Sequence, residues 1–264
     1  EGFFQLVNDS TYNMDIKFNT PGNDFKNILS LVPGIYTKDF KDLKTSGTAA
    51  FNGFVKGIYT TGKMPAYNVT ANIRNGSFQY PELPQPVQDI NLDLKAANVD
   101  GQPDNMVIEI PQATLKFGKE PFQFRLLYNQ PETAQYVDMA AKGKLDLGTI
   151  RQFIKLEGDT KIGGQVNADI EAKGNLNLVL QQKPGPFQAK GLIQLINLMY
   201  ASKEFPQPIR NTNATIEVSN PDGVPDHTVV NIPAGHAEFG DDKVDFTLHL
   251  TNPATDPAVD GSVK

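Results

Sequence analysis

Two short polar motifs contain the residue types that could bind a metal ion. Both follow the pattern Asn-x-Asp-Gly-x-Pro-Asp, the first from Asn98 to Asp104 and the second from Asn220 to Asp226. Oxygen ligands around a glycine turn are typical of calcium loops, but the bidentate Glu that completes an EF-hand loop is missing here. Asx side chains followed by glycine also form a tight turn by themselves. We therefore predict a turn at both motifs, with a weak cation site as the alternative.

The three histidines, His227, His236 and His249, do not have the spacing of a metal site. Neither H-E-x-x-H nor H-x-x-E-H occurs, and the chain has no Gly-x-Ser-x-Gly nucleophile motif. Cysteine is absent, which excludes disulfides and thiolate chemistry. We predict that the protein is not an enzyme and that it uses no metal ion and no other cofactor.

The composition excludes other classes of protein. The 264 residues include 24 basic and 30 acidic side chains, for a net charge of −6, whereas a nucleic-acid binder is expected to be basic. No apolar run reaches the roughly 18 residues of a membrane span. Because the chain begins with Glu1 rather than Met, we expect a fragment whose targeting signal and anchor lie outside it.

An internal repeat organises the chain. Residues 82–138 align without a gap with residues 204–260, a shift of 122, and 21 of the 57 positions are identical. Upstream, the pair Lys56-Gly57 aligns best with Lys173-Gly174, a shift of 117. A third similarity links Ile16–Pro21 with Leu126–Pro131 and Leu248–Pro253. We predict one continuous structural module made of the tail of a preceding repeat, repeat unit 1 and repeat unit 2, at residues 1–24, 25–146 and 147–264.

Each unit is predicted to open with a short helix. Apolar residues at i, i+3, i+4 and i+7 define one helix face, and a Pro-Gly pair at 33–34 ends the first helix. Thr149 is the candidate N-cap of the second. The apolar positions are Phe25, Ile28, Leu29 and Val32 in the first copy and Leu147, Ile150, Phe153 and Ile154 in the second.

The remainder is predicted to be strands, because apolar and polar residues alternate with a period of two. The segment 191–200 also fits a helix, but it aligns with the strand-like residues 69–78, so we predict a strand. The fold prediction is mainly β: tandem helix-plus-antiparallel-β-meander repeats that form one extended, curled β-sheet, a groove. The predicted turns are Thr61-Gly62, Asn75-Gly76, Asp100-Gly101, Gly118-Lys119 and Gly240-Asp241.

One face of such a sheet is apolar and must be covered by something. Two short helices cannot cover about a dozen strands, so either the sheet folds on itself as a sandwich or part of the apolar face stays open. A long open apolar face would be a lipid or partner site. The shift of 122 is even, so equivalent residues of the two copies should occupy the same face. The lipid-groove candidates are Leu92, Leu94, Phe122, Phe124, Leu126, Ile216, Val218, Val244, Phe246 and Leu248.

Three segments in order carry a family resemblance. They are Met14–Pro21 leading into Phe25–Pro33, then Ser46–Gly57, then Asn72–Pro84 followed by Val87 and Ile90. Over nearly the whole chain this pattern resembles the AsmA-like family of Gram-negative bacteria. The resemblance implies a periplasmic part of an inner-membrane-anchored protein, with a long β-groove and a role in outer-membrane biogenesis or in phospholipid transport between membranes.

Three functions compete at this point. The leading prediction is a non-enzymatic lipid-handling scaffold whose partners are phospholipids or other acyl chains, with envelope proteins as further partners. The alternative is an envelope assembly or interaction protein that acts through β-sheet edges without binding lipid. The third is a secreted hydrolase or glycan binder, which would need a polar pocket with convergent acids.

Overall fold

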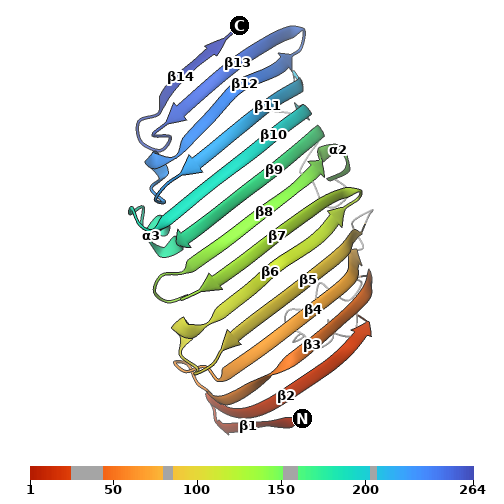
Figure 1. Ribbon diagram of the computed structural model, residues 1–264, viewed down its shortest axis with the longest axis vertical. Coiled ribbons are helices and arrows are strands. Elements are labelled where there is room, and N and C mark those ends of the chain that lie inside the picture. The colour runs from red at the N-terminus through yellow and green to blue at the C-terminus, as the bar shows by residue number, and fades with distance from the viewer. Residues whose placement is uncertain (25–43, 80–85, 151–159, 203–206) are drawn as a thin grey trace. The chain divides into compact units, whose positions relative to one another are not determined.

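The computed structural model describes residues 1–24, 44–79, 86–150, 160–202 and 207–264. These residues form one antiparallel meander of 14 strands in which each strand pairs with the next along the chain (Figure 1). The mainly β prediction is thereby confirmed. The strands are β1 (Gly2–Asn8), β2 (Thr11–Asp24), β3 (Lys44–Tyr59), β4 (Ala66–Gln79), β5 (Val87–Asn98), β6 (Val107–Phe117), β7 (Glu120–Asn129), β8 (Tyr136–Asp146), β9 (Lys161–Asn175), β10 (Phe187–Ala201), β11 (Ile209–Asn220), β12 (Val229–Phe239), β13 (Asp242–Thr251) and β14 (Ala258–Val263).

Helical structure is sparse in the described part of the chain. It consists of the α-helical turns α2 (Leu147–Ile150) and α3 (Leu176–Leu180) and the 3-10 turns η2 (Pro103–Asn105) and η3 (Pro225–His227). The helix expected at 25–33 lies outside the described residues, as do positions 153 and 154 of the second helix. A helical turn at the predicted place of the second helix is present and begins at Leu147.

The cap of that second helix differs from the prediction. Asp146, and not Thr149, caps it: Asp146 Oδ1 accepts hydrogen bonds from the backbone N–H groups of Gly148 and Thr149. The Thr149 hydroxyl instead donates to the Asp146 carbonyl. Aspartate is as good an N-cap as threonine and adds a charge that favours the helix N-terminus.

The chain divides into two compact units. The first contains β1 to β5, β6 as far as Lys116, and residues 124–138. The second contains β9 to β14 with residues 117–123 and 139–150. The sheet is open, because β1 and β14 are its two edges. The curl of the sheet into a groove stays a prediction.

The internal repeat is visible in the secondary structure. β5, η2, β6 and β7 of the first copy have the same bounds as β11, η3, β12 and β13 of the second after a shift of 122. β3 and β9 begin at Lys44 and Lys161, which is the predicted shift of 117. The strand over 191–200 is confirmed as part of β10.

The third similarity joins segments that lie at different places in the strand order. Ile16–Pro21 lies in β2, which precedes β3 as β8 precedes its equivalent β9. Leu126–Pro131 lies at the end of β7 and in the following turn. The assignment of residues 1–24 to the tail of a preceding repeat stays a prediction.

Asn75-Gly76 does not form the predicted turn between strands. Both residues lie within β4, where the pairing with β5 shifts between Ile73 and Gly76. Asn75 has a φ of 50°, a conformation that asparagine adopts more readily than most residues. The result is a β-bulge, which places an extra residue in the strand.

The second copy repeats this bulge with the same bracing. Asn197 has a φ of 49°, and the pairing of β10 shifts between Leu195 and Leu198. In each copy an asparagine of the next strand accepts the bulge N–H at 3.0–3.1 Å and donates back to its own strand. These braces are Asn91 and Asn213, which are identical in the repeat.

Candidate functional site

Strand register places an apolar row across the first unit. Residues that lie opposite each other in an antiparallel ladder occupy the same face. Leu94 lies opposite Ala71, which lies opposite Phe51. Leu92 lies opposite Ile73, which lies opposite Ala49. Two predicted site residues, Leu92 and Leu94, thus belong to a face that we call the apolar face.

The apolar face of this unit also includes residues that the site prediction missed. Phe18 lies opposite Gly53, and Ile16 lies opposite Val55. The ring centroids of Phe18 and Phe51 are 4.9 Å apart with a 15° angle between the planes. The signal for these positions was the alternation of Met14, Ile16 and Phe18 in the sequence.

The second unit repeats the arrangement and brings its five predicted site residues to one face. Ile216 lies opposite Ile193, and Val218 lies opposite Val230, which lies opposite Leu250. On the same strand as Leu250, the alternating Val244, Phe246 and Leu248 lie opposite Ala237, Gly235 and Ile232. Ile232 and Gly235 are three positions apart, so simple alternation would place them on opposite faces. The bulge between them in β12 keeps both on the apolar face.

The three candidates on β7 also alternate with exposed residues. Phe122, Phe124 and Leu126 are half-buried, whereas Gln123 and Arg125 are exposed. The Phe122 ring packs edge-on against Phe117, with ring centroids 6.1 Å apart. Period-two burial places the three on one side of β7, and their contribution to a lipid site stays a prediction.

The opposite face carries cross-strand ion pairs. Lys56 Nζ is 2.9 Å from Asp15 of β2, and Lys190 Nζ is 2.6 Å from Glu171 of β9. In both cases the partners lie directly opposite each other in the ladder. These charged side chains are compatible with water, so the sheet is amphipathic, with ion pairs on one face and the apolar row on the other.

Aromatic rings on the apolar face lie against glycines of the neighbouring strand. A Cβ on Gly53 would be 3.0 Å from the Phe18 ring, and one on Gly235 would collide with the Phe246 ring. Glycine thus leaves room for the tip of each ring over the backbone of the next strand, an arrangement known to protect exposed glycines in sheets.

Burial shows how little covers this face in the described part of the chain. The buried apolar residues there are alanine, valine and isoleucine only, such as Ala49, Ala214 and Ile232. The phenylalanines and leucines of the apolar face are half-buried, whereas domain cores normally bury these large side chains completely. The described strands form one sheet, and the large side chains of its apolar face keep part of their surface exposed.

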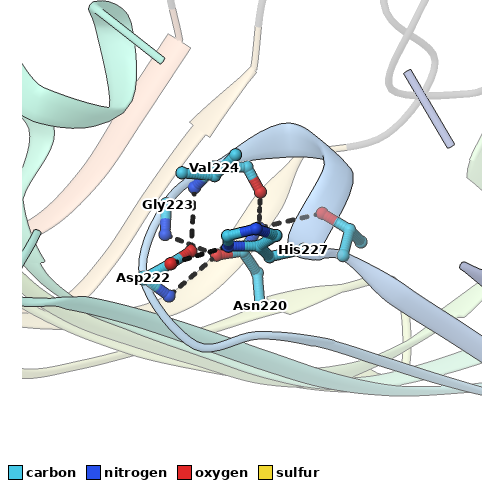
Figure 2. Close-up of polar contacts among 6 residues, drawn as sticks. Asn220, Asp222, Gly223, Val224 and His227 are labelled. Carbon is cyan, nitrogen blue, oxygen red and sulfur yellow. Dashed lines mark hydrogen bonds and ion pairs between the residues drawn. The ribbon is translucent and has the colours of Figure 1, made fainter. Parts of the chain in front are cut away.

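The two polar motifs form turns, as predicted. In the second copy, Asn220 Oδ1 accepts from the N–H groups of Asp222 and Gly223, and its Nδ2 donates to the Val224 carbonyl at 2.8 Å (Figure 2). Asp222 accepts from the Val224 N–H and contacts His227 Nδ1 at 2.7 Å. The oxygens that a cation would need already accept hydrogen bonds from the protein.

The first copy has the same turn with one exchange. Asn98 Nδ2 donates to the Gln102 carbonyl, and Asn98 Oδ1 accepts from the Gly101 N–H, both at 2.8 Å. Asn105, the equivalent of His227, donates to Asp100 Oδ2 at 2.7 Å. A neutral amide and an imidazole thus make the same contact, so this position needs only a hydrogen-bond partner.

A second role of the motif was not predicted. Asp104 Oδ1 accepts from the N–H groups of Glu132 and Thr133, and the Thr133 hydroxyl donates to Oδ2 at 2.6 Å. Asp226 makes the same three bonds with Ala254 and Thr255. Each motif therefore joins the β5–β6 or β11–β12 turn to the turn two strands later. The partners are 28 or 29 residues apart, so local spacing gave no signal for them.

We expect Gly101→Ala to lower the free energy of unfolding by roughly 1 kcal/mol or more. Gly101 has a φ of 78°, and its equivalent Gly223 has 86°, which confirms the predicted positive values. An added Cβ would also collide with the Met64 carbonyl oxygen. Urea unfolding of the variant measures the loss, and Gly62→Ala, with nothing within 4 Å of the new Cβ, is the control. An unchanged stability for both variants would contradict this account.

Calcium should not change the melting temperature. Within the described residues, no group of three or more His, Asp or Glu side chains is placed to hold a metal ion. A ligand that binds the folded state raises its stability by mass action, so a thermal melt with and without millimolar calcium is a direct measurement. A calcium-dependent rise would favour the cation-site alternative.

Acid should weaken the hydrogen bonds by which Asp104 and Asp226 join their turns to the turn two strands later. The hydrogen bond from Thr133 holds the pKa of Asp104 below its usual value, and the one from Thr255 does the same for Asp226. A lowered folded-state pKa contributes stability above the unfolded value of about 4, which is lost as pH falls through the folded value. The melting temperature should therefore drop on acidification below about pH 4.

The double variant Asp104→Asn/Asp226→Asn tests this origin of the acid effect. It should melt at a lower temperature than the parent at pH 7, with a shallower decline on acidification. Some decline remains, because hydrogen bonds also lower the pKa of Asp93 and Asp100. Parallel melting curves across the pH range would assign the acid effect to other carboxylates.

The histidines lie on three different elements: His227 in η3, His236 in β12 and His249 in β13. His236 contacts Asp245 at 2.7 Å and Glu238 at 3.7 Å, and the hydrogen bond with Asp245 raises its pKa. His236 and Asp245 lie opposite each other, as do His249 and Asp260. His236 and His249 therefore lie on the face opposite the apolar face, where such pairs act as cross-strand contacts.

Among the described residues, no helix is both long and apolar enough to span a membrane. The candidate site in each unit is the apolar face of its strands, and the turn motifs have a structural role. No family model, no curated protein and no solved structure matches this chain.

Proposed function

We propose that this chain is a non-enzymatic lipid-handling scaffold that holds acyl chains against its apolar face. The observation that carries the proposal is the accessible row of large apolar side chains, with no second layer over it among the described residues. Covering such a face is worth roughly 25 cal/mol per Å² of apolar surface removed from water. An acyl chain supplies this gain without hydrogen-bonding groups that would need partners.

The alternation of rings and glycines on this face supports an acyl chain as the ligand. The rings of Phe18 and Phe246 reach over glycines of the neighbouring strand. A flexible hydrocarbon chain can adapt to the shape of such a surface, whereas a protein helix needs ridges and grooves that match its own. In this proposal the apolar face lines a groove along which the chain lies.

The cellular setting in the proposal comes from the resemblance to the AsmA-like family alone. On that basis the protein acts in the periplasm, as part of an inner-membrane-anchored protein, in outer-membrane biogenesis or phospholipid transport between membranes. Phospholipids are then the acyl-chain partners, and envelope proteins are further partners.

Mass spectrometry of lipid that copurifies with the chain tests the proposal. The protein, produced in the periplasm of a Gram-negative host and purified without detergent, should carry phospholipid that organic extraction releases. After lipid removal it should take up a fluorescent fatty acid. Absence of both copurified lipid and fatty-acid uptake would overturn the proposal and favour the alternative of an interaction protein that acts through sheet edges.

A further inference from the structure

A buried hydroxyl group on β11 of the second unit lacks a hydrogen-bond partner. Thr212 is 8% exposed, and its Oγ1 atom is buried and unpaired among the described residues. Thr45 of the first unit also has an unpaired hydroxyl, but that side chain is only half-buried. Because buried side-chain oxygens in proteins are almost always paired, the Thr212 hydroxyl is a candidate contact for a bound molecule.

Strand register places Thr212 on the apolar face. It lies two residues before Ala214 on β11, and side chains two apart in a strand point to the same face. Ala214 lies opposite Gly235, which in turn lies opposite the site residue Phe246. The equivalent residue in the first copy is Ile90, so the fold of the repeat does not require a hydroxyl group at this position.

The far end of β11 offers an apolar contact instead. Asn220 ends the strand, and its distance from Thr212 along the strand is roughly 27 Å. The turn that begins at Asn220 rises above the strands, and the Asn220 side chain is already hydrogen-bonded within it (Figure 2). Val179 of α3 and Phe187 of β10 lie against Gly223 of this turn, since a Cβ on Gly223 would be 2.5 and 3.5 Å from their side chains. One end of β11 thus suits the polar end of an acyl chain, and the other suits its methyl end.

We propose that Thr212 positions the acyl chain: its hydroxyl group donates a hydrogen bond to the carbonyl oxygen of the chain's carboxyl or ester group, and the methyl end lies towards α3. The inference rests on the proposed function, because it orients the ligand of the same face. A threonine hydroxyl can donate as well as accept, and a carbonyl oxygen is an acceptor that fatty acids and phospholipids share. In the complex Thr212 gains a partner, and the carbonyl group keeps a hydrogen bond after it leaves water.

A Thr212→Val variant separates a ligand contact from a structural role. Valine has nearly the same shape without the hydroxyl group, so the free chain should be at least as stable as the parent in urea unfolding. Its affinity for palmitate and for methyl palmitate, measured by displacement of a fluorescent fatty acid, should fall about fivefold. Thr215→Val is the control, because Thr215 lies opposite Gln194 on the other face of the sheet. Lower stability with unchanged affinity would assign the Thr212 hydroxyl to the fold and overturn the proposal.

Palmitate and methyl palmitate distinguish the two sources of the carbonyl group. A loss of affinity for palmitate alone would assign the contact to a free carboxyl group, a loss for methyl palmitate alone to an ester such as that of a phospholipid, and a loss for both to the carbonyl group in either form. If the Thr212→Val variant binds both as tightly as the parent does, the inference is overturned while the proposed function stands. A parent that binds neither would overturn both.

Spin-labelled stearic acids test the orientation of the chain. A label near the carboxyl group should broaden the NMR signals of the amides around Thr212, and a label near the methyl end should broaden those around Gly223. The isotope-labelled parent chain is used, so this measurement does not depend on the folding of any variant. Equal broadening at both places, or the reverse order, would overturn the proposed orientation.

Discussion

A Phe124→Glu variant should keep its fold and lose most of its uptake of a fluorescent fatty acid. Phe124 is half-buried on β7, so the new carboxylate can reach water and need not be buried without a partner. A charge on the surface that receives the acyl chain would have to be desolvated when the chain binds. We expect an affinity loss of at least about tenfold, which corresponds to roughly 1.4 kcal/mol.

Gln123→Glu is the matched control for this variant. It places the same carboxylate one residue earlier, at an exposed position on the other side of the strand, and should leave both folding and uptake unchanged. Fatty-acid titration and urea unfolding of the three proteins separate the outcomes. Global unfolding of Phe124→Glu would show that this face is a closed core, because burying an unpaired charge costs several kcal/mol.

An Asn98→Ala variant should lower the free energy of unfolding by about 2–4 kcal/mol. Asn98 is fully buried, at 0% exposure, and its side chain makes both hydrogen bonds of the turn. Truncation removes these bonds and leaves the N–H of the buried Gly101 without its partner, whereas the Gln102 carbonyl still accepts from the Asn105 N–H. Leaving buried backbone groups unpaired is more costly than the loss of a surface hydrogen bond.

Urea unfolding measures this loss, with Asn19→Ala as the control. Asn19 is an exposed asparagine of β2, and its substitution should change stability by no more than about 0.5 kcal/mol. Asn220→Ala should also destabilise the protein, because Asn220 makes the equivalent bonds. A loss below 1 kcal/mol for Asn98→Ala would mean that the Asn98 side chain contributes little to the stability of this turn.

The repeat made much of the fold predictable from the sequence. Alternation identified β5, β7 and β13, and alignment with the first copy resolved 191–200 as strand when its own pattern was ambiguous. The five second-copy candidates, from Ile216 to Leu248, fall on one face. The candidates on each strand are two residues apart, and side chains two apart in a strand point to the same face. Local patterns of this kind depend only on the strand and its neighbours.

Other features depend on contacts that local spacing does not encode. Asn75-Gly76 has the composition of a turn, but Asn91 on the next strand stabilises it as a bulge within β4. The bonds from Thr133 to Asp104 join turns that are far apart in sequence. The short helix α3 was missed because its five residues, Leu176–Leu180, are too few to show a helical period.

The bulges have a consequence for how such a gene can change. Residues with a left-handed backbone conformation recur at equivalent positions in both copies, as in Asn75 with Asn197 and Asp89 with Asn211. Recombination between the codons of Asn98 and Asn220 would delete or duplicate 122 residues, the six strands β6 to β11, and preserve every bulge and both faces. Because each strand pairs only with its neighbours, the product remains foldable. Strand number is therefore a property that duplication can adjust in single steps, without any compensating substitution.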